Sequence, residues 1–485
     1  MKSKYCNLPI LLNDFLSVDC NTSFTFLGHV KDLMCAAACL TLLFMLGSCG
    51  ESPAGRLKIS NDIMATLTIP MPLRQSISPD AVSIESDFRK ALLQAVEANE
   101  GYRAALFSEQ ALLADIGVAE SVRRWQVTGN STVGGLRETG GAQSSKTTTG
   151  IAGGVTASQL IYDGGESVAN INTASAQAVG AQLDRIIIGN ELALEAARAW
   201  IDLWQFEKKL DLLKARSMEM ETVVSQIKRM ASNGMIDRAA LDSVLRKIVN
   251  ISLEQARLQS DLGQAQVRFA RFFHQEPTGL EMPTDLISTF DARAQAGAWR
   301  EAPNLQRSAV ELIVAQNSVL AAKAAFKPKA KLQTGVTSPM QHGESTDVSL
   351  GVALEYTLGD GGKRNAQLDA AEARLASARD GLLDAQRSLK AEMDATVQQL
   401  DAIELSMPLL ERQITLSASG AKTAKSQLAT GQANLNQVIE AKIEQYRAED
   451  RKITAHAEKV IMQFVIASRA GLLGHIIGLP SDISE

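Results

Sequence analysis

Asp163-Gly164-Gly165 and Asp360-Gly361-Gly362 are two copies of one short segment, and each is followed by a glycine, Gly234 or Gly431, at the same distance. Segment and glycine both recur after 197 residues (163 to 360 and 234 to 431). A fixed offset held by separate landmarks indicates an internal duplication. Within each copy, 71 residues with almost no turn-forming sequence separate the landmarks (163 to 234 and 360 to 431). At 1.5 Å per residue, this length predicts a helix roughly 100 Å long.

Composition gives no sign of catalysis or of nucleic-acid binding. The 485 residues are 45% hydrophobic and 21% charged, with a net charge of −5, so no basic surface for nucleic acid is expected. The five histidines are scattered without metal-ligand spacing. No Ser-His-Asp or paired-carboxylate arrangement stands out. We therefore expect a protein that is not an enzyme, with no catalytic residue, no metal site and no cofactor.

The N-terminal region indicates export and lipid attachment. All five cysteines lie in the first 49 residues, so disulfides have no structural role beyond them. The apolar run 34–46 is too short to span a bilayer but suits a secretory signal. Leu46-Gly47-Ser48-Cys49 resembles a bacterial lipobox, in which Cys49 is acylated, so residues 1–48 are an upstream segment and lipoprotein signal peptide. A plain signal peptide with a chance cysteine is the alternative. Residues 49–83, with four prolines, indicate an extended tether.

Two repeats, 84–297 and 298–485, follow the tether, each with a helix, a β-hairpin, a long helix and a return helix. Helical spacing in the first repeat predicts one helix from about Phe88 to Arg124. Strict alternation of apolar with small or polar residues from 348 to 356 predicts a strand. The expected hairpin, long helix and return helix are 126–161, 163–232 and 237–274 in the first repeat, and 330–357, 360–429 and 434–473 in the second.

Four aromatic residues stand where helix and strand meet: Trp125, Tyr162, Phe326 and Tyr356. They would form an interfacial girdle if the strands enter a membrane, or would fill the junction between helices and sheet. Four strands cannot close a barrel, and open edges in lipid cost several kcal/mol for each unpaired backbone group. Subunits must then pool their strands. Two copies give about enough strands for a filled barrel, whereas three give a wider interior.

The duplicated Asp-Gly-Gly segment predicts a helix start. Asp163 and Glu166 have the spacing of a capping box, in which Glu166 reaches back to the Asp163 backbone, whereas Lys363 replaces the glutamate in the second copy. The glycines allow a sharp change from strand to helix direction. No base, nucleophile or phosphate-binding loop accompanies the segment. We interpret Asp163, Gly164, Gly165, Asp360, Gly361 and Gly362 as a structural strand-to-helix motif.

The far ends of the long helices predict turns. Each long helix stops at a glycine, Gly234 or Gly431, and a fresh cap follows with Asp237 or Asn434. Each copy therefore folds back as an antiparallel coiled-coil hairpin whose tip points away from the strands.

In this order, and doubled, these features resemble the TolC family of outer-membrane efflux and secretion ducts, over about residues 84 to 479. The resemblance is carried by segments 160–165 and 358–362, by the helix starts Asn99-Glu100 and Ala302-Pro303, and by the tips at Gly234 and Gly431. It implies a mainly α fold with a small β part. Long antiparallel coiled-coil helices would form a trimeric α-barrel, and four strands per protomer would enter a shared transmembrane β-barrel.

The resemblance also implies a function and partners. The homotrimer would be a passive outer-membrane channel of a tripartite efflux pump or type I secretion system in a Gram-negative bacterium, with its helices in the periplasm and its strands in outer-membrane lipid. An inner-membrane transporter would supply energy. A periplasmic membrane-fusion adaptor would contact the tips, so Gly234, Asp237, Gly431 and Asn434 would be contact and gate residues. A periplasmic adaptor and a structural coiled-coil lipoprotein are the alternatives.

Overall fold

The computed structural model describes residues 54–67, 86–138, 146–233, 238–273, 280–283, 292–338, 346–429 and 435–480. The chain divides into two units, Met1–Pro53 and Ala54–Glu485, and every described residue lies in the second. The predicted signal segment, Cys49 and most of the predicted tether lie outside the described residues. Helix α2 (Ala54–Thr66) precedes the two repeats. It lies in the segment predicted to be an extended tether, so that prediction was wrong for these residues. The buried side chains of Ile59 and Ile63 belong to the main hydrophobic core, which favours a packed helix here.

Both repeats contain a helix, two strands, a long helix and a return helix in the same order, and the first repeat begins with the additional helix α3. The first comprises α3 (Ser86–Ala98), α4 (Glu100–Ser121), β1 (Gln126–Glu138), β2 (Lys146–Tyr162), α5 (Glu166–Ser232) and α6 (Arg238–Phe272). Helix α8 (Ala292–Gly297) and the short helix η2 (Trp299–Glu301) come next in the described chain. The second repeat comprises α9 (Pro303–Ala324), β3 (Lys329–Ser338), β4 (Asp347–Glu355), α10 (Lys363–Ala429) and α11 (Leu435–Arg469), and α12 (Leu473–Ile477) follows.

Equal helix lengths make the two repeats structural copies of each other. Helices α4 and α9 both have 22 residues and start 203 residues apart, at 100 and 303. Helices α5 and α10 both have 67 residues and start 197 apart, at 166 and 363. Helices α6 and α11 both have 35 residues and also start 197 apart, at 238 and 435. The offset drops across the sheet because the first hairpin is longer than the second.

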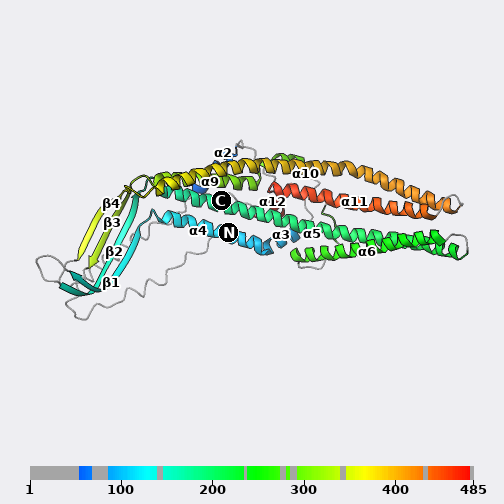
Figure 1. Cartoon of the computed structure of the whole chain (residues 1–485), viewed down its shortest axis with the longest axis horizontal. Coiled ribbons are helices and arrows are strands. Elements are labelled where there is room, and N and C mark those ends of the chain that lie inside the picture. The colour runs from blue at the N-terminus through cyan, green and yellow to red at the C-terminus, as the bar shows by residue number, and fades with distance from the viewer. Residues whose placement is uncertain are drawn as a thin grey trace. The chain divides into compact units, whose positions relative to one another are not determined.

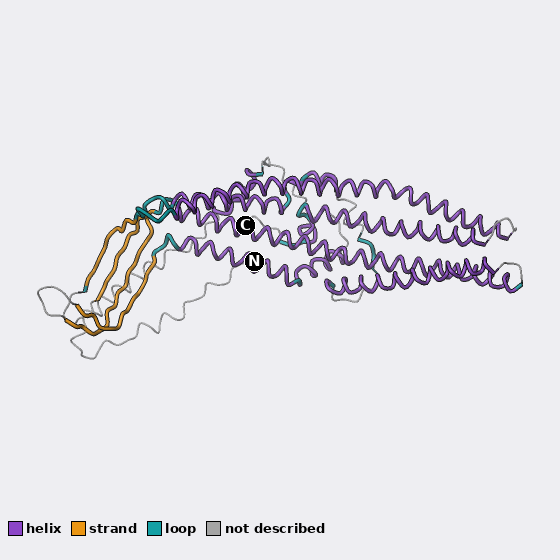
Figure 2. Tube along the Cα trace, viewed as in Figure 1, coloured by secondary structure: helices purple, strands orange, loops and turns teal. Residues whose placement is uncertain are grey.

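The four strands form one antiparallel sheet in the order β1-β2-β3-β4. Val127 lies opposite Ala157 in the first hairpin, and Ala330 lies opposite Leu354 in the second. The pairing of β2 with β3 joins the hairpins, with Val155 opposite Val336. Within the second unit the sheet lies at one end of the helices, while α6 and α11 lie toward the other end, beside α5 and α10 (Figures 1 and 2).

The helix expected from about Phe88 to Arg124 is in fact two helices, so this prediction was wrong. The chain leaves helical geometry at Asn99, whose φ and ψ of −71° and 131° are extended. The Asn99 side chain accepts a hydrogen bond from the Gly101 backbone N–H at 2.8 Å. Asparagine competes for backbone donors in this way and is therefore a strong N-cap. Asn99 therefore starts α4 as a separate helix. Pro408 does not divide its helix in this way, because α10 continues on both sides of it.

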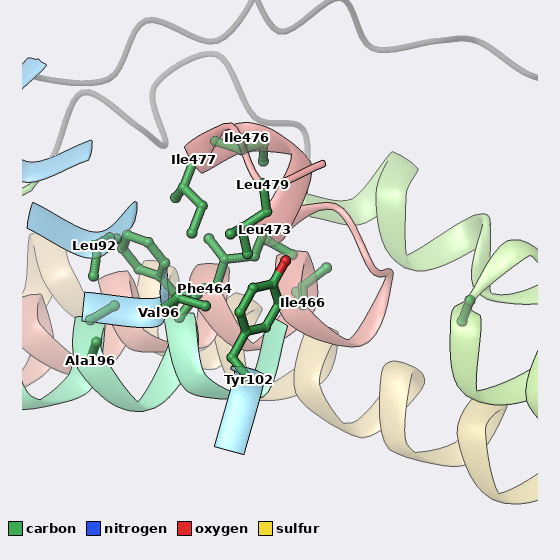
Figure 3. Close-up of a cluster of buried hydrophobic side chains, with 14 of the residues drawn as sticks. Leu92, Val96, Tyr102, Ala196, Phe464, Ile466, Leu473, Ile476, Ile477 and Leu479 are labelled. Atoms are coloured by element: carbon green, nitrogen blue, oxygen red, sulfur yellow. The ribbon is translucent and has the colours of Figure 1, made fainter. Parts of the chain in front are cut away.

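The main hydrophobic core lies at the middle of the helices. Trp200 of α5 packs its ring against Phe88, Phe269 and Phe273, with centroid separations of 5.1, 5.7 and 5.5 Å. Figure 3 shows α12 at this core, with Leu473 near Phe464 and Tyr102. Aromatic pairs of this geometry stabilise a core beyond their burial alone. The core thus fixes α3, α5, α6, α11 and α12 together.

A buried arginine of α5 joins α4 and the segment that follows α12. Arg185 of α5 pairs with Glu109 of α4 and donates to the Tyr102 hydroxyl at 3.2 Å and to the Pro480 carbonyl oxygen at 2.8 Å. A buried guanidinium is tolerated only when its donors are satisfied in this way.

Among the helices of the described residues, none is both long and apolar enough to cross a membrane.

Candidate functional site

The sheet has one apolar face, and this face is exposed. On β4, Val348, Leu350, Val352 and Leu354 alternate with small or polar residues, and their side chains are 64–77% exposed. Residues directly opposite each other in neighbouring strands point to the same face of a sheet. The strand register therefore extends the apolar face across all four strands, where it comprises Val127, Val133, Ile151, Val155, Leu332, Val336, Val348, Leu350, Val352 and Leu354.

The opposite face of the same sheet is polar. Its residues include Thr128, Asn130, Thr132, Thr156, Lys331, Gln333, Ser349 and Glu355. Strands that alternate between an apolar and a polar face are typical of a sheet with lipid on one side and water on the other. A soluble protein rarely leaves so large an apolar surface exposed. This face is the first part of the candidate site.

Both edges of the sheet are open. Among the described strands, β1 pairs only with β2, and β4 pairs only with β3. The outer edges of β1 and β4 thus carry rows of backbone N–H and C=O groups that can pair with another strand. In lipid, leaving them unpaired is costly because no water is present to bind them. These edges are the second part of the candidate site.

The four aromatic residues lie where the sheet meets the helices. Trp125 directly precedes β1, and Phe326 lies between α9 and β3; both are partly buried. The Arg364 guanidinium lies over the Phe326 ring, 5.2 Å from its centroid. Tyr162 ends β2 and Tyr356 follows β4, and both are exposed. The interfacial girdle and the filling of the junction therefore both remain predictions for these residues.

The first Asp-Gly-Gly segment is a hydrogen-bonded turn. Asp163 Oδ1 accepts from the Gly165 N–H at 3.0 Å, and Oδ2 accepts from the Ser167 N–H at 2.6 Å. Burial alone would raise the pKa of Asp163, but these hydrogen bonds outweigh it and the pKa lies below its ordinary value. Gly164 and Gly165 have positive φ values of 72° and 99°, which side chains disfavour. The segment thus turns the chain from β2 into α5.

Glu166 does not complete the predicted capping box. Its carboxylate pairs instead with Lys329, whose Nζ lies 2.6 Å from Glu166 Oε2. Nearby, Lys327 Nζ donates to the Gly164 carbonyl oxygen at 3.1 Å. An opposite charge from the neighbouring strand is therefore a stronger partner for Glu166 than a backbone N–H. These two lysines join the β2–α5 junction to the α9–β3 junction.

The second Asp-Gly-Gly segment has the same geometry. Asp360 accepts hydrogen bonds from the N–H groups of Gly362 and Arg364, both at 3.1 Å, and from Arg364 Nε at 2.7 Å. The Arg364 side chain is the main reason that the pKa of Asp360 lies below its ordinary value. Gly361 and Gly362 have φ values of 66° and 89°. Both aspartates thus accept hydrogen bonds from backbone N–H groups at the start of the following helix, which supports a structural role for them.

The predicted tip residues Gly234, Asp237, Gly431 and Asn434 lie outside the described residues. In the described part, α5 ends at Ser232 and α6 begins at Arg238, while α10 ends at Ala429 and α11 begins at Leu435. The contact and gate roles of the four tip residues therefore stay predictions, as does acylation of Cys49.

Charged groups that sequence reasoning missed connect the two helix pairs. Arg216 of α5 makes two hydrogen bonds to Glu449 of α11, at 2.9 and 2.6 Å. Lys442 of α11 pairs with Glu219 of α5 at 2.7 Å. These partners are 233 and 223 residues apart, and a single sequence carries no signal that pairs them.

Metal chemistry has no support in the described residues. They contain no group of three or more His, Cys, Asp or Glu side chains that could hold a metal ion. His456 packs edge-on against the Trp204 ring, at a centroid separation of 5.8 Å. Burial is the main reason that the pKa of His456 lies below its ordinary value.

Comparisons with known proteins agree with this geometry. Residues 297–464 match the family model described as outer membrane efflux protein. No curated protein matches the sequence. Solved structures with a similar fold include a membrane protein from Pseudomonas aeruginosa, with 16% identity and a TM-score of 0.75, covering 88% of this chain and 97% of that one.

Two further solved structures are of channel proteins. CusC, which forms a transmembrane channel, is 14% identical with a TM-score of 0.72, and the match covers 90% of this chain and 100% of that one. The CmeC outer membrane channel of Campylobacter jejuni is 13% identical with a TM-score of 0.69, over 81% and 86% of the two chains. The expected resemblance is confirmed: the chain has the TolC-like fold, mainly helical with a small antiparallel sheet.

Asp163→Ala should destabilise the first strand-to-helix junction. Loss of a capping carboxylate costs about 1 kcal/mol of unfolding free energy, whereas Asp163→Asn, which keeps an acceptor oxygen, should cost less. Because the folded-state pKa is depressed, the charge contributes stability above the ordinary value of 3.8 and loses it as the pH falls further. Urea denaturation of the detergent-solubilised protein, followed by circular dichroism between neutral and acidic pH, measures both effects.

Asp115→Ala, at an exposed position of α4, is the matched control and should leave the unfolding free energy nearly unchanged. If Asp163→Ala were as stable as this control at neutral pH, the capping role would be wrong.

Proposed function

We propose that this chain is one subunit of a trimeric outer-membrane duct that passively conducts substrate out of the periplasm. The observation that carries the proposal is the exposed apolar face of a sheet with two open edges, mounted at one end of two pairs of long helices. The family match of residues 297–464 and the fold of known outer membrane channels support it.

The two faces of the sheet supply the two surfaces that a duct requires. Val348, Leu350, Val352 and Leu354 would contact lipid chains, whereas Lys331, Gln333 and Glu355 on the opposite face would contact water in the lumen. Such a duct excludes the bilayer and offers its cargo no strong binding site. Selectivity for a substrate would then belong mainly to the transporter that feeds it.

Three copies satisfy the strand edges better than two. Each copy contributes four strands. A barrel of about eight strands is filled by its own side chains, whereas a barrel of about twelve has a wider interior. Conduction requires the wider interior, so the trimer is the assembly we propose.

The far ends of the helices would be the contact region for other proteins. In this proposal, a periplasmic adaptor docks near Gly234 and Gly431, and an inner-membrane transporter of a tripartite efflux pump or a type I secretion system supplies the energy. Opening would involve movement of the tips, including Asp237 and Asn434.

Neither alternative fits the described residues as well. A periplasmic adaptor has one helical hairpin flanked by compact β-domains, whereas the described part of this chain has two long helix pairs and one four-stranded sheet. A structural coiled-coil lipoprotein would have no use for strands with an apolar face. The duct accounts for both features.

Arginine on the apolar face should block assembly in the outer membrane. Leu350→Arg, near the middle of β4, places a charge in lipid at a cost of about 2–4 kcal/mol near the bilayer midplane, and Leu354→Arg, near the end of the strand, should cost less. Ser349→Arg, on the polar face of the same strand, is the matched control and should assemble. Membrane fractionation and the fraction of trimer on native gels measure the outcome. A structural lipoprotein would tolerate all three changes equally.

Bulky charged residues at the tips should impair export without preventing assembly. Gly431→Arg and Gly234→Arg are expected to lower substrate export while trimers still form, because the tips would contact the adaptor and take no part in the barrel. Export by intact cells and the native mass of the purified variants are the two readouts. Loss of the trimer in these variants would argue against a contact role.

Acylation of Cys49 predicts that the full-length chain incorporates radioactive palmitate in cells. Cys49→Ala should abolish the label, whereas Cys39→Ala should leave it unchanged. Continued labelling of the Cys49 variant would contradict the lipobox interpretation.

A further inference from the structure

A groove lies between α2, α5 and α9. Its volume is about 500 Å³, within the range of small-molecule sites. The polar part of its lining comprises Lys58, Asp62, Asn172, Gln316 and Asn317. Leu320 of α9 adds an apolar surface that is 56% exposed. The groove therefore combines charged groups, amides and an accessible apolar side chain.

The amide side chains of the groove have unused hydrogen-bonding groups. Asn317 is only 8% exposed. Its Nδ2 donates to the Ile313 carbonyl oxygen at 3.0 Å, while its Oδ1 has no hydrogen-bond partner among the described residues. The side chains of Asn172 and Gln316 make no hydrogen bond within the described chain either. Buried polar groups usually have partners, so the groove is suited to a polar ligand that supplies them.

Two opposite charges line the groove. Lys58 and Asp62 are exposed and one helical turn apart on α2, with about 6 Å between their Cβ atoms. Neither forms an ion pair with the other or with any further residue that the structure describes. A lysine that precedes its carboxylate by four residues is the weaker order for such a pair. The groove thus presents a separate cation and anion, which is complementary to a zwitterion.

The groove lies close to the junction of the helices and the sheet. Asn172 comes six residues after the start of α5 at Glu166, or about 9 Å along the helix axis. Leu320 and Gln316 come four and eight residues before the end of α9 at Ala324, or about 6 and 12 Å. The headgroup layer of a bilayer is about 5–8 Å thick on each side. If the apolar face of the sheet lies in hydrocarbon, the groove lies where the headgroup layer meets water.

The predicted lipid anchor favours a position of this groove outside the duct. Cys49 precedes Ala54, the first residue of α2, by five residues, and an extended chain spans at most about 3.6 Å per residue. An acylated Cys49 would therefore keep the start of α2 within about 18 Å of its leaflet. The interior of a closed barrel offers an acyl chain no bilayer. Helix α2 and its groove would then face lipid headgroups instead of the lumen.

We propose that this groove binds the headgroup of a zwitterionic membrane lipid that carries a phosphate and a primary ammonium. Lys58 pairs with the phosphate, while Asp62 and the Oδ1 atom of Asn317 accept hydrogen bonds from the ammonium, which has three N–H donors. The lipid chains lie along Leu320 toward the sheet. A purely anionic headgroup fits less well, because Asp62 repels it. This inference rests on the proposed function, because it requires the sheet to lie in a membrane.

Lipid binding to the full chain in detergent tests the chemistry. Native mass spectrometry compares the purified protein after addition of phosphatidylethanolamine, phosphatidylcholine or phosphatidylglycerol with identical acyl chains. The methyl groups of choline remove the N–H donors of the ammonium, and the glycerol headgroup has no cation. The dissociation constant should therefore be about tenfold lower for phosphatidylethanolamine than for either other lipid. Equal binding of all three lipids would overturn the proposal.

Free phosphoethanolamine distinguishes a lipid site from a site for a soluble zwitterion. It lacks the chains that lie along Leu320, so it should bind at least about tenfold more weakly than the lipid. Competition with bound lipid in the same mass spectra measures this difference. A free headgroup that binds as tightly as the lipid would contradict the assignment to a lipid.

Charge variants locate the binding in the groove. Asp62→Asn should weaken the binding of phosphatidylethanolamine about tenfold and leave that of phosphatidylcholine unchanged, because only the first lipid donates to this carboxylate. Lys58→Gln should weaken both about tenfold, since both carry a phosphate. Lys90→Gln, at an exposed position of α3 outside the groove, is the matched control. The three side chains are exposed, so circular dichroism should show unchanged helical content.

Membrane fractionation of the parent chain separates failure of this inference from failure of the proposed function. A parent chain that is absent from the outer membrane would overturn both. A parent chain that resides there, but whose lipid binding is insensitive to Lys58→Gln and Asp62→Asn, would overturn the inference alone.

Discussion

Unpaired backbone at the edges of a small sheet is the constraint on which the rest of this structure depends. Strands β1 and β4 each have one neighbour within the described chain, and the sheet exposes an apolar face. Both features are unfavourable for an isolated copy in water, and the open edges are also unfavourable for an isolated copy in lipid. Assembly with further copies in a membrane, as we propose, would relieve both at once, and the long helices would then extend from the assembled sheet.

Duplication explains how one chain supplies such a unit. The two repeats have long helices of equal length, and an Asp-Gly-Gly turn directly precedes each of them, α5 in the first repeat and α10 in the second. Within one copy, the interface between repeats is complete, with Lys327 on Gly164 and Lys329 on Glu166. The outer surfaces of the same repeats are open. A repeated unit with one internal interface and two unmatched outer surfaces is suited to form a ring of identical copies.

Features with a local cause could be predicted from the sequence. The alternation of apolar residues predicted β4, and Asp163 and Asp360 predicted the helix starts, because a strand face and a helix start each depend on a few consecutive residues. Long-range pairing could not be predicted. Glu166 pairs with Lys329, and Arg216 pairs with Glu449, because the fold brings together residues that are far apart in the chain. Asn99 shows the limit of helical periodicity, since one capping side chain outweighs a continuing apolar pattern.

Hydrogen exchange at the edge strands measures the central constraint most directly. In the purified protein in detergent, some backbone amides of β1 and β4 lie on the outer edge of the sheet and have no partner within one copy. These amides should exchange as slowly as those of β2 and β3, because strands of neighbouring copies pair with them. Rapid exchange of these outer amides, with slow exchange retained in β2 and β3, would contradict the account.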